Sequence, residues 1–282
     1  ILLYLKKEYK LDDIELSLLD YKFILGFENF LRGHKPRHYQ KQIGNNAVMK
    51  HIQRLRRMVT LAYDIEWIGQ DPFRKFKQKL IPTHRGHLTG KELELFEELT
   101  LHSLRLRTVK DLFVFSCYTG ISYIDMMLLS EESLVMGLDK RMWIATKRQK
   151  TRNPVKIPLL SKALNIIKIY REDKRCQIYG TLFPKISNQK VNAYLKEIAI
   201  AAGIQKNLTF HMARHTFATT VTMTNGVPIE TISKMLGHRK LTTTQIYAKV
   251  IEQKVCDDME ILREKLEINR ASYKSKNTKR IH

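Results

Sequence analysis

The feature that most constrains the fold of this chain is the loss of helical periodicity between residues 76 and 88. The stretch "FKQKLIPTHRGHL" has no apolar repeat, contains proline and glycine and stays basic, which is typical of a linker. With 43% apolar residues in 282, a core can be buried on each side of it. We predict a domain over residues 1–80, a linker over 81–88, a second domain over 89–270 and a basic, disordered tail over 271–282.

Before the linker, the pattern predicts an all-helical domain. In "ELSLLDYKFILGFENFLRGHKP", apolar residues recur at helical spacing until Gly33 ends the run. The next segment, "NNAVMKHIQRLRRMVTLAYD", has apolar residues on one side and Lys50, Arg54 and Arg57 on another. This basic stripe fits either a solvated face or a surface that contacts phosphate, and the sequence leaves both interpretations open.

After the linker, the pattern predicts a mainly α-helical domain with one small antiparallel β-sheet. Thr89 and Glu92 form a capping box that begins a helix. In the segment 133–158, "RMWIATKRQ" is rich in β-branched and aromatic residues and "VKIPL" follows the turn signal "TRNP", which indicates a β-hairpin. Helices are then predicted over residues 161–173, 187–202, 209–224, 228–236 and 242 to about 268.

The charge of the chain favours a polyanionic partner. It has 50 lysines and arginines against 28 acids, a net charge of +22, which suits nucleic acid or an anionic membrane surface. Membrane binding is the weaker alternative, because the basic residues are spread over many predicted elements. No apolar run approaches the ~18 residues of a membrane span, and the start "ILLYLKKEYK" is too short a run for a signal peptide. We therefore expect a cytoplasmic protein, and a fragment, since residue 1 is isoleucine.

The cysteines argue against a disulfide framework or a metal site. Cys117, Cys176 and Cys256 are odd in number and widely spaced, and no CxxC pair is present. Such residues are usually buried thiols. We predict no metal ion and no cofactor.

The strongest local signal lies in two neighbouring stretches near the C-terminus. In "LTFHMARHTFATT", His211 and Arg214 are three residues apart and share one face of the predicted helix, in an otherwise apolar stretch where an arginine needs an anionic partner. In "GVPIETISKMLGHRKLTTTQIYAKV", His238 directly follows a helix stop at Gly237, and Tyr247 lies on the next helix. Each pattern alone is common in packed cores, so only their combination is informative.

Together these residues resemble the tyrosine recombinases, the family of phage-type integrases. The family pattern HxxRHTFAT, then LGH and a tyrosine nine residues later, stands here as His211, Arg214, His238 and Tyr247. The hairpin lysine of the family falls on Lys150, in "QKT" before "VKIPL". "CYTGISYID" further resembles integrases of Bacteroides conjugative elements.

The resemblance covers about residues 85–265 as the mixed α/β catalytic domain, and residues 1–80 look like the helical core-binding domain. It implies site-specific cleavage and rejoining of duplex DNA through a 3′-phosphotyrosine, without metal or ATP, to integrate or excise a mobile element. It also implies four protomers on two DNA sites, and it leaves room for accessory proteins that bend DNA.

The roles implied by the resemblance fit the chemistry of a phosphodiester. Arg214 and His238 would donate hydrogen bonds to the non-bridging oxygens. Tyr247 would attack, and because a phenol of pKa near 10 is only ~0.1% ionised at neutral pH, His211 is the candidate base. Lys150 is the candidate general acid for the leaving 5′ oxygen.

The sequence departs from the family at the first catalytic arginine. The family has "TGxR", whereas "TGIS" places Ser122 there, and a hydroxyl supplies neither charge nor a bidentate fork. Residues two apart on a strand point the same way, so if Lys150 enters the site, Arg148 should flank it on the same face, while Lys147 and Gln149 point away. We therefore predict that Arg148 replaces the missing arginine; the alternative is that it only contacts DNA backbone beside the site.

Other polar residues near these motifs have less definite assignments. Asp125 stands where the family has an acidic residue, and either orients Arg214 or His211 or is an ordinary acid on a helix face. Contacts to DNA are predicted for six basic residues: Lys50, Arg54, Arg57, Arg152, Arg239 and Lys240.

The segment after Tyr247, "VIEQKVCDDMEILREKL", carries an apolar stripe of Val255, Met259 and Leu262. This stripe would pack on a neighbouring protomer or on its own domain.

Two other functions remain open: a catalytically degenerate protein that only binds DNA, and type IB topoisomerase-like strand passage. The DNA sequence recognised and the direction of recombination cannot be inferred from the chain.

Overall fold

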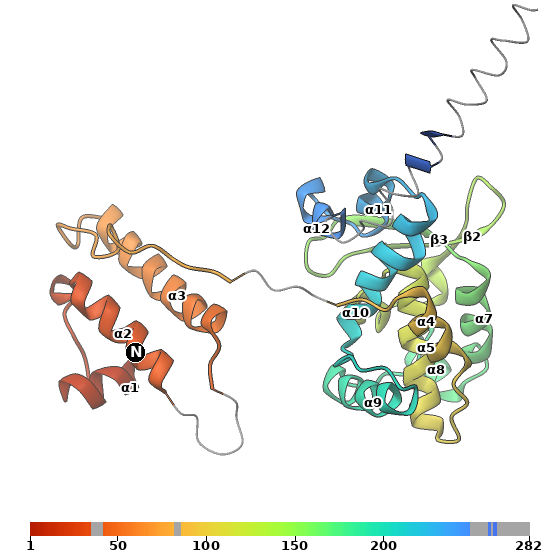
Figure 1. The fold of residues 1–282 in the computed structure, drawn as a ribbon, viewed down its shortest axis with the longest axis horizontal. Coiled ribbons are helices and arrows are strands. Elements are labelled where there is room, and N and C mark those ends of the chain that lie inside the picture. The colour runs from red at the N-terminus through yellow and green to blue at the C-terminus, as the bar shows by residue number, and fades with distance from the viewer. Residues whose placement is uncertain (35–41, 82–85, 249–258, 261, 264–282) are drawn as a thin grey trace, which may run out of the picture. The chain divides into compact units, whose positions relative to one another are not determined.

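The computed structural model describes residues 1–34, 42–81, 86–248, 259–260 and 262–263. The chain forms two compact units, Ile1–His84 and Arg85–His282, and their boundary falls inside the segment 81–88. Figure 1 shows a helical first unit and a larger second unit in which helices accompany a small sheet. The mainly α fold with a small antiparallel sheet is confirmed.

Unit 1 is built around two long helices, α2 (Tyr21–Gly33) and α3 (Asn45–Asp64). Asp20 begins α2 as its N-cap, where its carboxylate accepts the Phe23 N–H at 2.7 Å. The shorter elements are α1 (Leu2–Tyr4), η1 (Leu5–Tyr9) and η2 (Leu16–Leu18). Phenylalanines of α2 and aliphatic residues of α3 form a core that is separate from the core of unit 2.

The centre of unit 2 is α5 (Leu104–Thr119), which packs against α7 (Ser161–Tyr170), α9 (Asn188–Ala201) and α10 (Phe210–Thr216). Its last two turns are buried on nearly every side, as expected of a helix that other helices surround (Figure 1). The other helices that precede α10 are α4 (Gly90–Glu98), α6 (Tyr123–Met126), η3 (Glu131–Ser133) and α8 (Lys174–Tyr179).

Past α10 the chain continues as a π-helix, η4 (Phe217–Thr222), instead of the regular helix predicted to residue 224. Threonine hydroxyls in this segment donate to main-chain carbonyls, for example Thr219 to His215 at 2.7 Å, and so compete with regular helical bonding. The remaining elements are η5 (Met223–Asn225), α11 (Ile229–Met235), η6 (Leu241–Thr243) and α12 (Gln245–Ala248).

The sheet has three antiparallel strands in the order β1 (Leu134–Met136), β2 (Met142–Lys147) and β3 (Pro154–Pro158). Lys147 pairs with Pro154, so β2 ends there and residues 148–153 form a turn. The Arg148 N–H donates to the Asn153 carbonyl at 2.9 Å and closes this turn. The premise that strand alternation extends from Arg148 to Lys150 is therefore wrong.

Several predictions lie wholly or partly outside the described residues. The helix predicted from 242 to about 268 is described as α12 and then only at residues 259–260 and 262–263, and the tail 271–282 is not described. Cys117 and Cys176 are buried free thiols, as predicted, whereas Cys256 lies outside the described part.

The described part of the chain has neither a membrane-spanning helix nor a cluster of metal ligands. None of its helices combines the length and apolarity that crossing a membrane requires. Nowhere in it do three or more His, Cys, Asp or Glu side chains gather closely enough to hold a metal ion.

Candidate active site

Arg214 is the centre of the candidate site. It lies on α10 with only 4% of its surface exposed. Its guanidinium donates to the Gly120 carbonyl at 2.6 Å and to the Leu236 carbonyl, and lies 3.2 Å from the Nε2 of His238. Burial, and next the charge of Arg148, lower the pKa of Arg214 to about 10, so it remains a cation at neutral pH. A buried cation whose close partners are neutral groups is suited to receive an anion.

The turn after α5 holds one of these carbonyls in place. Gly120 has a φ of +68°, and a Cβ at this position would meet Phe217 at 2.5 Å and Leu236 at 2.8 Å. Glycine is therefore required both for the left-handed backbone and for the close packing. The next residues, Ile121 and Ser122, lead directly into α6.

His238 follows the end of α11, where Gly237 has a φ of +62°. Its Nδ1 lies 2.8 Å from the Thr244 hydroxyl, and its Nε2 faces Arg214. Burial, then Arg214, then Arg148 lower the pKa of His238 to about 4, so the imidazole is neutral at pH 7. Thr244 was not among the predicted site residues, although "LTTTQIY" places it three residues before Tyr247.

Tyr247 is buried on α12, with 4% of its surface exposed, in a small apolar cluster with Phe217 and Leu236. Its ring meets the His215 ring edge-on, at 5.2 Å between centroids, and His215 in turn contacts His211 at 4.7 Å. The structure thus joins the predicted nucleophile to the predicted base through His215. Sequence reasoning did not assign His215, although it lies one turn from His211.

Asp125 connects α6 to the turn between β2 and β3. Its carboxylate accepts the Ser122 hydroxyl at 2.6 Å and the Gln149 N–H at 2.9 Å, and lies 3.7 Å from Nε of Arg148. Its predicted partners were Arg214 or His211, with an ordinary acid on a helix face as the alternative. The carboxylate is directed towards the hairpin, where residues 148–149 pack beside the start of α6, and its charge also opposes the lowering of the Arg214 pKa.

Arg148 is mostly buried, with 15% of its side chain exposed. A Cβ at Gly237 would meet its Cδ at 2.7 Å, so glycine is required there for the hairpin to pack against the loop that carries His238. The Asn153 side chain strengthens this contact by donating to the Gly237 carbonyl at 3.2 Å. Because the charge of Arg148 lowers the pKa of both Arg214 and His238, the site contains two neighbouring guanidinium groups and a neutral imidazole.

Lys150 is exposed within the turn 148–153. Arg152, in the same turn, has a φ of +57°, and its N–H donates to the Arg148 carbonyl at 2.8 Å. The structure therefore brings Arg148 to Arg214 and His238, and leaves Lys150 at the surface of the hairpin. Arg152, Arg239 and Lys240 are also exposed.

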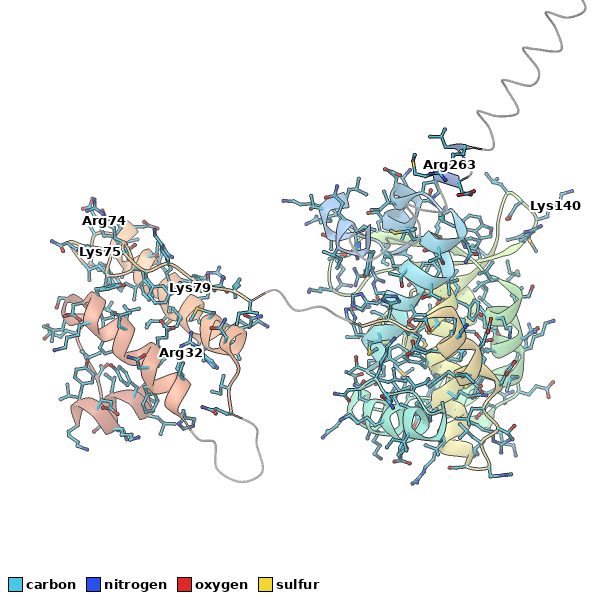
Figure 2. The ribbon with its side chains drawn as sticks, in the orientation of Figure 1. Arg32, Arg74, Lys75, Lys79, Lys140 and Arg263 are labelled. Atoms are coloured by element: carbon cyan, nitrogen blue, oxygen red, sulfur yellow. The ribbon has the colours of Figure 1, made fainter. Side chains whose placement is uncertain are left out.

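The basic stripe of α3 lies opposite the core of unit 1. Lys50, Arg54 and Arg57 are exposed, whereas the buried residues of α3 occupy the other side of the helix. Arg56 differs, because its guanidinium lies over the Phe73 ring at 5.8 Å. Figure 2 shows further basic side chains at the surface of this unit, among them Arg74, Lys75 and Lys79.

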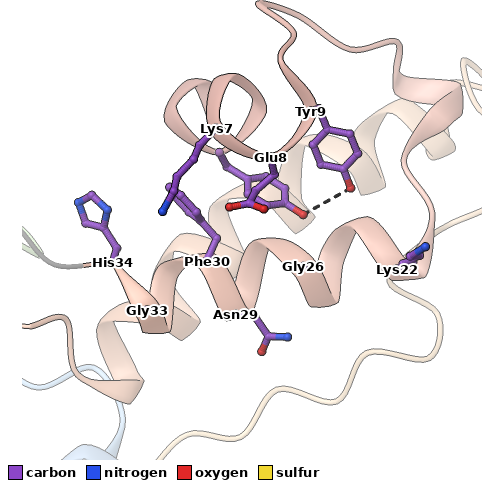
Figure 3. A pocket seen from close by; sticks show the side chains of 10 residues that line it. Lys7, Glu8, Tyr9, Lys22, Gly26, Asn29, Phe30, Gly33 and His34 are labelled. Atoms are coloured by element: carbon purple, nitrogen blue, oxygen red, sulfur yellow. Dashed lines mark hydrogen bonds between the residues drawn. The ribbon is translucent and has the colours of Figure 1, made fainter.

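A hollow of about 560 Å³ in unit 1 lies between η1 and α2 (Figure 3). It is lined by Tyr4, Lys7, Tyr9 and Phe30, among others, and the Tyr4 and Tyr9 hydroxyls are 3.4 Å apart. None of the predicted site residues lines it. The candidate active site is therefore the cluster around Arg214 in unit 2.

Solved structures of integrases share this fold. A lambda integrase dimer bound to a COC′ core site matches with a TM-score of 0.63 and 18% identity, over 86% of this chain and 85% of that one. The Tn1549 transposon integrase in complex with circular intermediate DNA matches with a TM-score of 0.65 and 15% identity, over 87% and 85%. At such identities the likeness establishes the fold alone.

The family is established by sequence. The phage integrase family model matches residues 88–254, more than half of the chain, and the phage integrase SAM-like domain matches residues 2–79. The chain belongs to the phage integrase family.

Curated relatives include two proteins named tyrosine recombinase XerD. The XerD of Staphylococcus saprophyticus is 30% identical over 165 residues, which are 55% of this chain and 53% of that protein. The XerD of Lacticaseibacillus casei is 24% identical over 220 residues, 73% of each. The chain thus spans about half the length of the first of these relatives.

Proposed function

We propose that this protein is a site-specific DNA recombinase that cleaves and rejoins duplex DNA through a 3′-phosphotyrosine at Tyr247. The observation that carries the proposal is the buried guanidinium of Arg214, held beside His238 and Arg148 in a unit of phage integrase fold. Fixed cations in a buried site stabilise the added negative charge of a phosphoryl transition state. Attack by Tyr247 conserves the energy of the phosphodiester, so that rejoining needs neither metal nor ATP.

Proton transfer is proposed for a histidine pair and for Lys150. His211 is separated from Tyr247 by His215, so we extend the proposed base role to this histidine pair. Lys150 is the proposed general acid, since its exposed ammonium on the hairpin turn is available to the leaving 5′ oxygen.

Arg148 is proposed to replace the family arginine that is missing at Ser122. Its burial, its ion pair with Asp125 and its effect on the pKa of Arg214 and His238 all support this role. Ser122 would act indirectly, because its hydroxyl is already donated to Asp125. A side chain that only contacted the DNA backbone would not need to be buried in this way.

We assign residues 1–80 to a core-binding domain, 81–88 to a linker, 89–270 to the catalytic domain and 271–282 to a basic tail. The exposed stripe on α3 would contact DNA phosphates. The complete complex would hold four protomers on two sites, through the stripe of Val255, Met259 and Leu262, of which Met259 and Leu262 are described and exposed.

The biological setting is also part of the proposal. The substrate would be a mobile element resembling the Bacteroides conjugative elements, recombined in the cytoplasm, where accessory proteins could bend the DNA. The support is the "CYTGISYID" stretch, in which Ser122 occupies the place of the arginine.

A second candidate function, DNA binding without catalysis, is favoured by one observation. Ser122 provides neither the positive charge nor the paired N–H donors of a guanidinium, and its hydroxyl already donates to Asp125. Topoisomerase-like strand passage has no comparable support, because the relatives found are named recombinases and integrases.

Covalent capture distinguishes the two functions. The protein would be incubated with nicked duplexes that carry a randomised core, and denaturation-resistant protein–DNA adducts would be collected and sequenced. We expect adducts with the natural chain and none with Tyr247→Phe. Retarded DNA in a native gel without any adduct would instead identify a binding protein.

A further inference from the structure

Three donors approach the Asp125 carboxylate, one from the start of α6 and two from the hairpin turn. The Ser122 hydroxyl donates to Oδ2 at 2.6 Å, and the Gln149 N–H donates to Oδ1 at 2.9 Å. Nε of Arg148 lies 3.7 Å from Oδ2, the same oxygen that accepts the serine hydroxyl. Neutral donors thus bind both carboxylate oxygens, whereas the guanidinium stays outside hydrogen-bond distance.

This open ion pair leaves a buried donor of Arg148 unused. An arginine beside a carboxylate usually pairs with it closely, at about 2.8 Å and often through two N–H groups. The Nε of Arg148 is instead buried without a hydrogen-bond partner among the described residues, although Asp125 is within reach of a small movement. A donor that has lost water without gaining an acceptor is unfavourable, so the surrounding contacts must impose this arrangement.

The Ser122 hydroxyl is available to impose it, because it does not cap its helix. Ser122 is the N-cap residue of α6, yet its side chain makes no capping hydrogen bond. The hydroxyl donates to the Asp125 side chain instead. This bond occupies a lone pair of Oδ2 and weakens the attraction of that oxygen for a second donor. Without the hydroxyl, Oδ2 would be open to the guanidinium of Arg148.

Closing the pair would change what Arg148 can do in the site. The guanidinium would shift by about 1 Å to reach a charged hydrogen-bond distance, and its N–H groups would be directed at the carboxylate. The side chain now packs at Gly237, and its charge acts on both Arg214 and His238. A displacement of this size in a group that must meet the phosphate can slow a reaction strongly.

We propose that Ser122 is a positioning residue that keeps Arg148 available for the phosphate. Its hydroxyl occupies the Asp125 oxygen that Arg148 would otherwise bind, while the Gln149 N–H holds the hairpin turn against the same carboxylate. The serine at the place of the missing arginine thus serves the arginine on the hairpin. The link to catalysis rests on the proposed function, whereas the link between Ser122, Asp125 and Arg148 is independent of it.

The test compares variants with and without the hydroxyl. Ser122→Ala removes it and Ser122→Thr keeps it. Ser103→Ala is the matched control, because Ser103 is also a partly buried N-cap residue without a capping hydrogen bond, at the other end of α5 from Gly120. Thermal unfolding establishes that each variant folds, and Ser122→Gly takes the place of alanine if that variant does not, since glycine suits an N-cap.

Two measurements are made on each variant. In crystal structures of the free protein, Nε of Arg148 should lie within about 3 Å of Oδ2 of Asp125 in Ser122→Ala, and outside hydrogen-bond distance in the natural chain and the other variants. The rate of Tyr247-dependent adduct formation on nicked DNA should fall on the order of tenfold in Ser122→Ala. It should stay within about threefold of the natural rate in Ser122→Thr and Ser103→Ala.

A double-mutant cycle with Arg148→Ala identifies the route of the effect. If Ser122 acts through Arg148, adding Ser122→Ala to Arg148→Ala should not slow cleavage further. A serine that donated directly to the phosphate would instead cost the same factor whether or not Arg148 is present.

The proposal is overturned if Ser122→Ala keeps either the open distance between Arg148 and Asp125 or the natural rate. It is equally overturned if the loss is the same with and without Arg148, or if Ser122→Thr loses as much activity as Ser122→Ala. If the natural chain forms no adduct at all, the proposed function fails, and the crystal structures alone decide whether Ser122 keeps Arg148 apart from Asp125.

Discussion

The two units carry their positive charge in different ways. On α3, Lys50, Arg54 and Arg57 are exposed and remain hydrated, whereas Arg214 is buried and Arg148 is mostly buried in unit 2. Exposed cations gain little from one fixed geometry and are screened by salt. Buried cations have already lost water during folding and act at one defined point. Under the proposed function, the exposed charge on α3 would hold DNA and the buried charge in unit 2 would serve the reaction.

The largest expected effect is that of Arg214→Ala. Removing the buried guanidinium should slow adduct formation on nicked DNA on the order of 10³-fold, while DNA affinity changes little. Arg214→Lys should remain slow, because an ammonium cannot donate to both carbonyls and the phosphate in the same geometry. Single-turnover cleavage and native-gel titration measure the two quantities. Equal losses of affinity and of rate would remove the distinction between the two kinds of charge.

Arg148→Ala should slow cleavage on the order of 10²-fold, because one of the two guanidinium groups that would bind the phosphate in the proposed site is lost. Adding Ser122→Arg to this variant should recover part of the rate, since the new side chain starts beside Asp125. Lys147→Ala, at the exposed end of β2, is the control. Cleavage by Arg148→Ala at the natural rate would show that Arg148 is not the replacement for the missing arginine.

Substitutions in the α3 stripe should act on binding rather than on chemistry. Each of Lys50→Ala, Arg54→Ala and Arg57→Ala should reduce the slope of log affinity against log salt by about 0.9, as one phosphate contact is lost. Arg56→Ala is the control, because Arg56 packs over Phe73 and should affect unfolding and not the salt slope. Unchanged slopes in all three stripe variants would indicate a solvated face.

The smallest expected effect is on the pH dependence of the unfolding temperature. The pKa of His238 is lowered to about 4, below its ordinary value of 6.5, so protonation favours the unfolded chain. This contribution to stability is complete above pH 6.5 and is lost as the pH falls towards 4. His238→Gln should therefore flatten the dependence of the unfolding temperature on pH in that window. An identical pH dependence in both proteins would contradict the half-buried, neutral imidazole.

Part of the site could be predicted because it lies in short, contiguous motifs. His211 and Arg214 are separated by less than one turn of a helix, and "LGH" lies directly after a helix stop, so local geometry fixes their relation. The position of Arg148 was expected from strand alternation, but the strand ends at Lys147. Arg148 reaches Arg214 and His238 because Asp125 and Gly237 hold the turn.

The contacts that sequence reasoning missed are made by residues with common side chains. Thr244 is one of three consecutive threonines, and only its burial under His238 distinguishes it from Thr242 and Thr243. Ser122 was interpreted as a loss, whereas its hydroxyl is engaged by the carboxylate that also faces Arg148. A hydroxyl has no periodicity and no fixed partner, so its role depends on which chain segment packs beside it.

The sequence by itself determined the class of fold, the helical character of both parts and the family, because apolar periodicity and motif spacing are local properties of the chain. Only the tertiary structure decided that Asp125 pairs with the hairpin, that His215 lies between His211 and Tyr247, and that Thr244 meets His238. These contacts join elements through packing, and packing depends on shape in three dimensions.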